Sequence, residues 1–384
     1  MTDRQVLSDE LLERIRSRAA GYDAANRFFT EDLEELKAAG YLRALVPERF
    51  GGLGLTLREV AREQQRLAAA APATALGVNM HLVWTGVAKV VADRGLDFLD
   101  FVSEEAAAGE VFGFGISEPG NDLVLFGSRT EAVPQDDGGY RFTGTKIFTS
   151  LSPAWTRLGL FGLDTVSEDA PKLVHAFIER DSPGYRILDD WDTLGMRATQ
   201  SHTTVLEGVL AAPDRVFRRL NPGPNPDPLI FGIFANFEIL LASVYTGISA
   251  RALELAAEAA HRRTSQKNGG APLARDPDIR WRIADAAFAH DALPPQIDAI
   301  ARDVDELVDH GSQWFRKLVG VKVRATETAR DVVDKAIRVS GGSSYSNSSE
   351  LGRLYRDVLA GMFHPSDDES AHGTVATAVL GPLP

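Results

Sequence analysis

The spacing of apolar residues predicts helices in the first part of the chain, residues 1–112. Apolar side chains recur every three or four positions in "LSDELLERIRSRAAGYDA" and in "FFTEDLEELKAAGYLRALV", which is the spacing of helices with one buried face. The segment "TALGVNMHLVWTGVAKVVADRG" is apolar over most of its length, as expected for a helix buried on all sides. We therefore expect an all-helical N-terminal domain.

Between residues 113 and 222 the pattern changes to short apolar runs separated by turn residues. The runs "LGLFGLDT", "KLVHAFIER" and "TTVLEGVLAAP" have the length and composition of strands. The sequence "DDGGY" at 136–140 combines the residues that favour a tight turn between two strands, so it predicts a hairpin. We expect this part to form a central, β-barrel-like domain.

The third part, residues 223–384, is expected to be a helical bundle. It begins within a Pro-rich connector, "NPGPNPDP", and continues with long amphipathic helices. Pro294 and Pro295 interrupt one of them, because proline removes a helical hydrogen bond. A last helix begins near Glu350. The predicted fold class is thus α+β: a helical domain, a β domain and a C-terminal four-helix bundle.

Composition narrows the possible functions. The chain has 384 residues and a net charge of −13 without a basic run, which argues against a nucleic-acid partner. It has no cysteine, so disulfides, thiolate catalysis and Cys-ligated metals are excluded. His310 and His372 lack the spacing of metal ligands, and we expect no metal site. Without a signal-peptide core or a run of about 18 apolar residues, we expect no membrane partner and a cytoplasmic location.

Three segments carry a resemblance to a known family. They are "FGISEPGND" (114–122), "YRFTGTKIFTS" (140–150) and "VSGGSSY" followed by "LGRLYRD" (339–357). In this order and at these intervals, they resemble the acyl-CoA dehydrogenase superfamily over nearly the whole chain. The resemblance implies that family's fold, a bound flavin that is normally FAD, and assembly as a homotetramer or homodimer.

The resemblance also implies contacts to the flavin ring. The first segment would bring Phe114, Ile116 and Ser117 to the flavin, with Ile116 and Ser117 along its pyrimidine edge. Phe148 would cover the ring, and Ser150 would reach the side that carries N5 and O4. A flat cofactor with a polar rim needs this combination of apolar surface and hydrogen-bonding groups.

Other residues match family positions that contact the rest of FAD. Arg262 matches an arginine that reaches the pyrophosphate bound by the partner subunit, where a guanidinium pairs well with phosphate oxygens. Gly341 and Gly342 would let the backbone approach the adenosine part of the flavin bound by the partner subunit, and Ser366 and Asp367 match positions near the adenosine ribose. The family loop that follows Glu-Pro is two residues longer and carries a serine that this chain lacks, so we expect looser binding.

The leading hypothesis is α,β-dehydrogenation of acyl-CoA or another thioester. The usual catalytic glutamate of the family falls on Pro365 here, and proline cannot act as a base. Some relatives carry the glutamate on the first helix of the C-terminal domain, where this chain has Phe237 with Glu238 next to it. Glu238 is therefore the candidate base for the α-proton, with electron-transfer flavoprotein as a possible acceptor.

Two alternatives remain open. The flavin monooxygenases of the same superfamily carry a histidine at the position of His364 and a serine at that of Ser150. A histidine suits proton transfer because its pKa lies near neutrality. Such an enzyme would use reduced FMN or FAD, supplied by a flavin reductase, as a co-substrate. The second alternative is a flavin-binding protein that has lost its catalytic base.

Overall fold

The N-terminal part is helical in the computed structural model, which describes residues 4–381. Its helices are α1 (Asp9–Ala25), α2 (Thr30–Ala38), α3 (Leu57–Ala70), α4 (Pro72–Asp93) and α5 (Asp100–Ala108). A capping box at the start of α3 joins Thr56 and Glu59, which satisfies backbone N–H groups that a helix start leaves free. Most residues of α4 are buried, as its apolar sequence predicts.

The strands of the central part lie in one eight-stranded sheet, in the order β6-β7-β3-β2-β4-β5-β8, with β1 paired to β4. They are β1 (Phe112–Gly115), β2 (Glu131–Pro134), β3 (Tyr140–Lys146), β4 (Arg157–Asp164), β5 (Lys172–Glu179), β6 (Tyr185–Ile187), β7 (Thr204–Ala211) and β8 (Val216–Leu220). The β1–β4 pair is parallel, and the predicted hairpin at 136–140 joins the antiparallel strands β2 and β3.

The C-terminal part is again helical. Its helices are α6 (Pro228–Arg262), α7 (Pro277–Asp291), α8 (Leu293–Asp305), α9 (Gln313–Ser340), α10 (Glu350–Val358) and α11 (Asp368–Leu380). The short strands β9 (Thr264–Ser265) and β10 (Ala271–Pro272) form a two-stranded hairpin after α6. The helix is interrupted between α7 and α8, next to Pro294 and Pro295, as the sequence predicts. The α+β fold class is confirmed.

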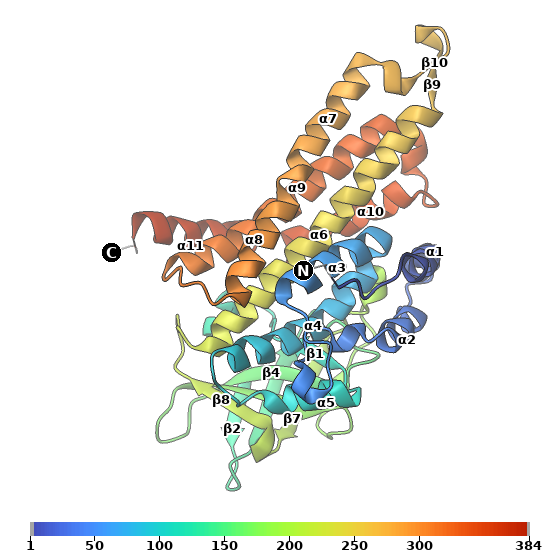
Figure 1. The fold of residues 1–384 in the computed structure, drawn as a ribbon. Helices are drawn as coiled ribbons and strands as arrows, with labels where there is room; N and C mark the ends of the chain where they lie inside the picture. The colour runs from blue at the N-terminus through green and yellow to red at the C-terminus, as the bar shows by residue number, and fades with distance from the viewer. Residues whose placement is uncertain (1–3, 382–384) are drawn as a thin grey trace.

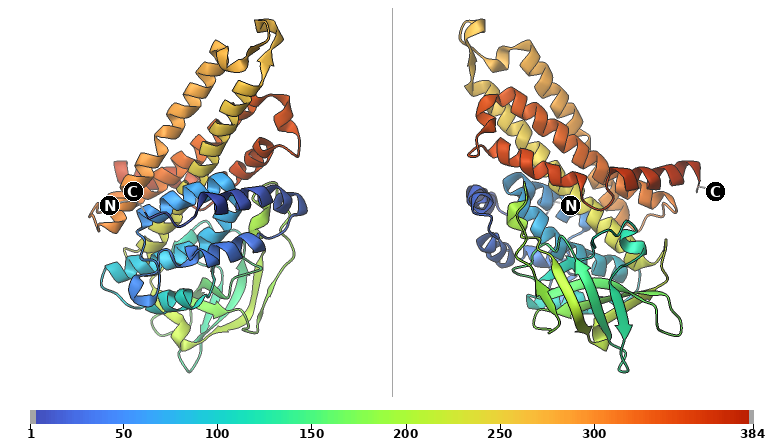
Figure 2. Two further views of the ribbon diagram at one scale, coloured as in Figure 1. Left: turned by 45° about the vertical axis from the view of Figure 1, so that its right-hand side comes forward. Right: turned by 180° about the vertical axis from the view of Figure 1, so that it is seen from behind.

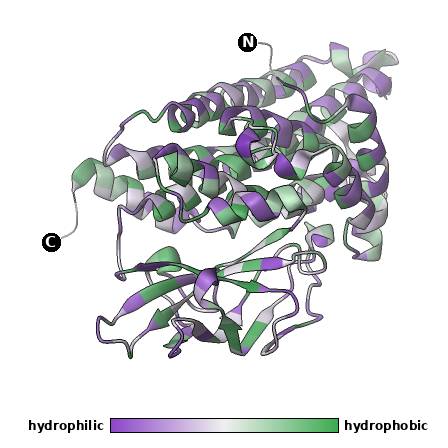
Figure 3. Cartoon of the chain, turned by 60° about the horizontal axis from the view of Figure 1, so that its bottom comes forward, coloured by the Kyte–Doolittle hydropathy of each residue, from purple (hydrophilic) through white to green (hydrophobic). Residues whose placement is uncertain are grey.

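The helices and the sheet form separate layers. Seen from behind in Figure 2 and from below in Figure 3, the sheet lies beneath the helices. Helix α6 runs through the middle of the helical part and packs against α3, α4 and α9. Trp84 of α4 joins the two layers: its ring contacts Phe114 and Phe177 of the sheet at centroid distances of 5.5 and 4.7 Å. Its Nε1 donates to the Gly113 carbonyl.

Helices α4 and α6 are long and apolar enough to cross a membrane by length and composition alone. In both, 89% of the most apolar window is buried inside the protein. Such burial is typical of core helices, which satisfy the same test without meeting lipid.

Candidate functional site

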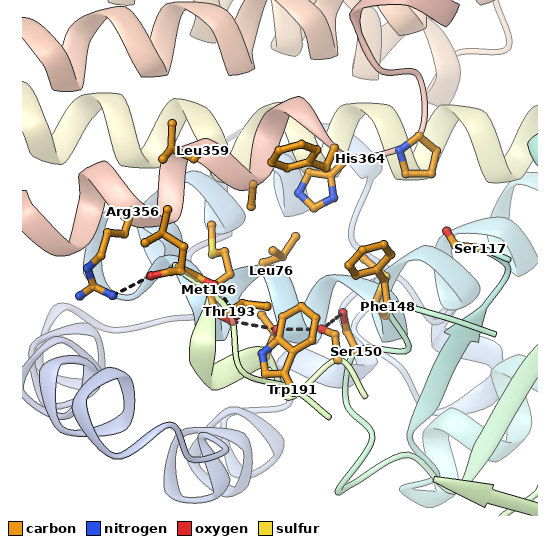
Figure 4. A pocket seen from close by; sticks show the side chains of 18 of the residues that line it. Leu76, Ser117, Phe148, Ser150, Trp191, Thr193, Met196, Arg356, Leu359 and His364 are labelled. Atoms are coloured by element: carbon orange, nitrogen blue, oxygen red, sulfur yellow. Dashed lines mark hydrogen bonds between the residues drawn. The ribbon is translucent and has the colours of Figure 1, made fainter. Parts of the chain in front are cut away.

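A cavity of about 270 Å³ lies between the sheet and the helices. This volume is near the lower end of ligand-binding pockets, roughly 300–1,000 Å³. In Figure 4, His364 and Leu359 enter it from the helical side, and Phe148, Ser150 and Trp191 enter it from the loops of the β domain. Its other lining residues are Leu76, Met80, Ser117, Thr193, Leu194, Gly195, Met196, Thr199, Ser201, Phe237, Arg356, Ala360, Phe363 and Pro365.

Phe148 and Ser150 belong to a tight turn that follows β3. Phe148 has a positive φ of 55°, an uncommon conformation for a bulky residue. The Ser150 amide donates to the Phe148 carbonyl at 2.9 Å. The Phe148 side chain is 53% exposed, and its ring meets Trp191 edge-on at 6.1 Å. The turn thus presents an aromatic face at the cavity wall.

A chain of hydroxyl groups runs along the same wall. The Oγ of Ser150 lies 2.8 Å from that of Ser201, which lies 2.7 Å from Oγ1 of Thr199. Thr199 Oγ1 donates to the Met196 carbonyl at 2.9 Å. Because the Thr199 hydroxyl donates to a carbonyl, Ser201 must donate to Thr199, and Ser150 must donate to Ser201. The Ser150 Oγ can therefore still accept a hydrogen bond.

Ser117 is held by a buried ion pair next to it. Glu118 Oε1 accepts a hydrogen bond from Lys146 Nζ at 2.6 Å, and both side chains are inaccessible to solvent. Burial acts to raise the pKa of Glu118, but the Lys146 charge and several N–H and O–H donors outweigh it and lower the pKa to about 2. The Ser117 carbonyl accepts from the Ile147 amide at 2.9 Å. The Glu-Pro motif therefore fixes the loop that carries Ser117.

On the helical side, His364 is joined to Tyr245 of α6. Its Nε2 lies 2.7 Å from the Tyr245 hydroxyl. Burial, together with the nearby Lys322 charge, lowers the pKa of His364 to about 3, so the imidazole is neutral at pH 7. Tyr245 is fully buried, and its side chain has no other hydrogen bond within residues 4–381. Its O–H therefore donates to Nε2, which assigns the remaining ring proton of His364 to Nδ1.

Lys322 of α9 fixes the loop on which His364 lies. Its Nζ donates to the carbonyls of Gly361, His364 and Ser366 at 3.3, 3.2 and 2.8 Å. Lys322 is only 1% exposed, and burial lowers its pKa. A buried cation with three carbonyl partners is a strong constraint on backbone position, so it holds the histidine at the cavity.

Glu238 lies behind the cavity wall. Phe237 lines the cavity, but Glu238 does not, because consecutive side chains on a helix point about 100° apart. Glu238 is 1% exposed, and its Oε2 has no hydrogen-bond partner among residues 4–381. Burial raises its pKa to about 8, against the opposing effects of the Ser366 hydroxyl and the Lys322 charge. Glu238 is thus a buried carboxyl without a direct route to a ligand.

The remaining sequence-derived candidates lie away from the cavity. Phe114 and Ile116 are buried beneath the wall at 8% and 3% exposure, and the Phe114 ring stacks on Phe237 at 5.6 Å. Arg262 is exposed at the far end of α6, 25 residues after Phe237, or roughly 37 Å along a helix. Whether it reaches a second subunit's flavin stays a prediction.

Gly341, Gly342, Ser366 and Asp367 also do not line the cavity. Gly341 ends α9 with a positive φ of 73°, and a side chain there would meet the Arg263 guanidinium at 2.6 Å. Gly342 begins the next turn and is exposed. Ser366 gives its carbonyl to Lys322, and Asp367 caps α11 by accepting from the Ser370 amide at 2.9 Å. Their predicted role in holding adenosine is untested.

The residues around the cavity fit the ring end of a flavin. One wall carries hydroxyl groups at Ser117, Ser150 and Ser201, and most of the lining is apolar or aromatic. The cavity offers what a flat heteroaromatic ring with a polar edge requires. No group of three or more His, Asp or Glu side chains with metal-site geometry occurs within residues 4–381.

Several of these residues could not be found from sequence motifs. Tyr245 and Lys322 contact the segment around His364 from distant parts of the chain, and Ser201 and Trp191 likewise contact Ser150 and Phe148. Thr199 joins this group through its neighbour Ser201. The one sequence signal is the polar Lys322 within the amphipathic α9, where a lysine at an apolar position of the helix indicates a buried charge that needs partners.

Family models match both helical parts of the chain. The model for the acyl-CoA dehydrogenase N-terminal domain matches residues 4–92, and that for the acyl-CoA dehydrogenase C-terminal domain matches residues 239–368.

Among curated proteins, the matches carry the names of an acyl-CoA dehydrogenase, nitrososynthases and monooxygenases. YdbM of Bacillus subtilis (strain 168), whose name places it among the acyl-CoA dehydrogenases, is 29% identical over 96% of this chain and 94% of its own length. L-evernosamine nitrososynthase of Micromonospora sp. is 29% identical over 92% of this chain and 84% of its own. Dibenzothiophene monooxygenase of Rhodococcus erythropolis is 29% identical over 92% and 88%.

Solved structures show the same range. KijD3, in complex with FMN and dTDP-3-amino-2,3,6-trideoxy-4-keto-3-methyl-D-glucose, is 27% identical, with a TM-score of 0.82 over 97% of this chain and 91% of that chain. Butyryl-CoA dehydrogenase of Megasphaera elsdenii is 19% identical, with a TM-score of 0.85 over 99% of both chains; this likeness shows the fold alone.

Proposed function

This chain belongs to the acyl-CoA dehydrogenase superfamily, and we propose that within it the protein is a monooxygenase that uses reduced flavin and molecular oxygen. From the sequence, dehydrogenation is the leading hypothesis and oxygenation an alternative. The side chains that line the cavity favour oxygenation.

The observation that carries the proposal is the absence of a carboxylate at the cavity. Within residues 4–381, no aspartate or glutamate lines it, and its titratable side chains are His364 and Arg356. Removal of an α-proton from a thioester needs a base within hydrogen-bond reach of that proton. Glu238, the candidate base, is buried behind Phe237. A dehydrogenase reaction is therefore poorly supported by this site.

His364 supports oxygenation better than dehydrogenation. It is neutral at physiological pH and presents Nδ1–H, because Nε2 accepts from Tyr245. We propose that this N–H donates a hydrogen bond to the oxygen that is being transferred, or to an electron-rich group of the substrate. The surrounding apolar side chains strengthen such a hydrogen bond by excluding water.

Reduced flavin, when bound, would supply two electrons, so that one atom of O₂ enters the substrate and the other leaves as water. Ser117 and Ser150 would hold the polar edge of the ring, and Phe148 would cover its face. The shortened loop after Glu118, which lacks the family's serine, supports flavin that binds and leaves rather than a permanently held FAD. The partner implied is a flavin reductase rather than an electron-transfer flavoprotein.

The relatives suggest the class of substrate. One is named for nitroso formation on an amino sugar and another for the oxygenation of dibenzothiophene. We propose a small molecule that presents a nucleophilic nitrogen or sulfur atom, or an electron-rich aromatic carbon. The cavity suits such a molecule, since Leu76, Met80 and Phe363 give it apolar walls. Within residues 4–381 no carboxylate lines it, so nothing there favours the protonated, non-nucleophilic form of an amine.

Two assays separate the proposal from its alternatives. Anaerobic addition of acyl-CoA thioesters of several chain lengths to the flavin-loaded protein should leave the visible flavin band unchanged. Oxygen uptake in the presence of reduced FMN and an amine, a thioether or indole should yield an oxygenated product. Bleaching by a thioester, lost in Glu238→Gln, would establish the dehydrogenase instead. Bound flavin with neither reaction would support the non-catalytic alternative.

A further inference from the structure

A second, open cleft of about 790 Å³ adjoins the cavity. The two share Thr193, Leu194 and Arg356 as wall residues, so the cavity and the cleft meet at these side chains. Figure 4 shows Arg356 at one end of the cavity, beside Leu359 and Thr193. The cleft differs in chemistry from the cavity, because its lining is rich in charged and hydroxyl side chains.

Four arginines line the cleft, and three of them have carboxylate partners. Arg356 Nη1 donates to Asp23 at 3.0 Å, and Arg197 Nη1 donates to Asp192 at 3.0 Å. Arg16 Nε lies 3.3 Å from Glu13, although in the described part of the chain its buried Nε and Nη1 have no hydrogen-bond partner.

The fourth, Arg353, has no such partner. It is 7% exposed, and within residues 4–381 its guanidinium makes no hydrogen bond and no ion pair within 4.0 Å. The carboxylate of Glu350, one turn before it, accepts two hydrogen bonds from the Arg251 guanidinium at 2.9 and 3.0 Å. Asp357, one turn after it, accepts from the Met196 amide at 2.6 Å. The Arg353 charge acts to lower the pKa of both Glu350 and Asp357, so these two carboxylates balance part of its charge through space. Within residues 4–381 its buried guanidinium still lacks a hydrogen-bonded anion, which is costly, and an anionic ligand would supply that partner.

The residues just before α10 supply further hydrogen-bonding groups to the cleft. Asn347, Ser348 and Ser349 line it just before α10. The Ser349 hydroxyl accepts from the Gly352 amide and Glu350 lies in the first turn of this helix, so the helix start itself is already capped and Asn347 and Ser348 supply the additional polar side chains. Four arginines line the cleft against three carboxylates, Asp23, Asp192 and Glu350, so its lining has an excess of one positive charge although the whole chain carries −13.

We propose that the cleft is a binding site for a phosphoryl group of the substrate, with Arg353 as its central contact and Arg16 as a second. The group to be oxygenated would lie in the cavity, and the phosphate or diphosphate would lie in the cleft. A guanidinium pairs with phosphate through two hydrogen bonds, which explains arginine rather than lysine here. This inference rests on the proposed function only in calling the ligand a substrate.

Direct binding tests the site without turnover. Inorganic pyrophosphate is titrated into the full-length protein by isothermal calorimetry at low salt, with malonate as a carboxylate of similar size. We expect one pyrophosphate per chain, bound more tightly than malonate. Arg353→Gln should weaken binding about 10-fold or more, as expected for loss of a charged hydrogen bond, and Arg16→Gln should weaken it less. The control is Arg186→Gln, an exposed arginine 3.0 Å from Glu207 and outside the cleft, which should bind normally.

The proposal fails if pyrophosphate does not bind, if malonate binds more tightly, or if Arg353→Gln and Arg16→Gln both bind like the wild type. Should Arg353→Gln not fold, Arg16→Gln alone decides, because its side chain is partly exposed (24%). The assay needs neither flavin nor oxygen, so its failure leaves the proposed oxygenase reaction standing. Conversely, an absence of oxygenation would not affect the binding result.

Discussion

Tyr245 and His364 share a hydrogen bond of 2.7 Å across 119 positions of the chain. Tyr245 comes from the centre of α6, and His364 from the loop before α11. The bond fixes both the orientation of the imidazole and its tautomer, since a buried tyrosine hydroxyl needs an acceptor. It also separates the roles of the two residues: His364 lines the cavity, whereas Tyr245 acts on it from behind as a positioning residue.

Replacement of His364 by Asn should lower oxygenation by about 10²–10⁴-fold, the usual contribution of a positioned proton donor or acceptor. Flavin binding should change little, because Ser117, Phe148 and Ser150 remain. The measurement is the ratio of oxygenated product to released hydrogen peroxide. Peroxide release should rise in the variant as less of the reduced oxygen is coupled to product formation. Tyr245→Phe keeps the imidazole but removes the donor to Nε2, so a loss of roughly 10-fold is expected. Full coupling in His364→Asn would contradict the assignment.

The pH behaviour of His364 follows from its lowered pKa. Since burial and Lys322 lower that pKa to about 3, the ring should stay neutral from pH 5 to 9, and its NMR signals should not shift over this range. His372 is the internal control, because the Asp368 carbonyl and charge raise its pKa and it should titrate above the usual value near ~6.5. A His364 titration near neutrality would exclude the neutral donor.

Glu238→Gln should leave oxygenation intact and should stabilise the protein at high pH. The raised pKa of about 8 means that the folded carboxyl keeps a proton which the unfolded chain loses above ~4.3. The free energy of unfolding therefore falls as pH rises from about 4 towards 8, and glutamine removes this loss. Urea unfolding at pH 5 and pH 8.5 should show a gain of roughly 1–3 kcal/mol for the variant at the higher pH only. Loss of oxygenation would restore Glu238 as a catalytic candidate.

Lys322→Met should displace the His364 loop. It leaves three backbone carbonyls without their common donor, so we expect a loss of roughly 2–4 kcal/mol in unfolding free energy and a fall in oxygenation beyond that of stability alone. Lys317→Met, on the same helix, is the matched control and should change stability little. Equal thermal midpoints and activities for the two variants would show that the anchor is unimportant.

Ser150→Ala should weaken the binding of reduced flavin about 10-fold, because it removes one hydrogen-bonding group at the cavity wall. Ser201→Ala keeps Ser150 but removes the partner 2.8 Å from it, so a smaller effect is expected. Anaerobic titrations with reduced FMN and reduced FAD measure both variants and show which flavin the protein prefers. Unchanged affinity in Ser150→Ala would place the flavin elsewhere.

The fold could be predicted from the sequence because its signals are local. The helical spacing before residue 112, the turn signal at 136–140 and Pro294-Pro295 each predict structure from neighbouring residues. Ser117, Phe148, Ser150 and His364, which the motifs singled out, line one cavity, and their roles towards flavin and substrate stay predictions.

The rest of the site depends on contacts that no local pattern reveals. The difference between Phe237 and Glu238 at the cavity is one step around a helix, which an alignment that is uncertain by one residue cannot resolve. The roles of Tyr245 and Lys322 arise only when α6 and α9 pack against the loop before α11. Arg353 looked like part of a helix motif, and its lack of a hydrogen-bonded partner is a property of the folded chain.

The most direct test of the central claim is oxygen-isotope transfer. The protein is mixed with reduced FMN and ¹⁸O₂ in the presence of an amine, a thioether or indole, and the masses of the products are measured by mass spectrometry. If the protein is a monooxygenase, the wild type forms a product that carries one ¹⁸O atom more than the substrate, and His364→Asn does not. Products without the label, together with bleaching of bound FAD by an acyl-CoA thioester under anaerobic conditions, would contradict it and identify a dehydrogenase.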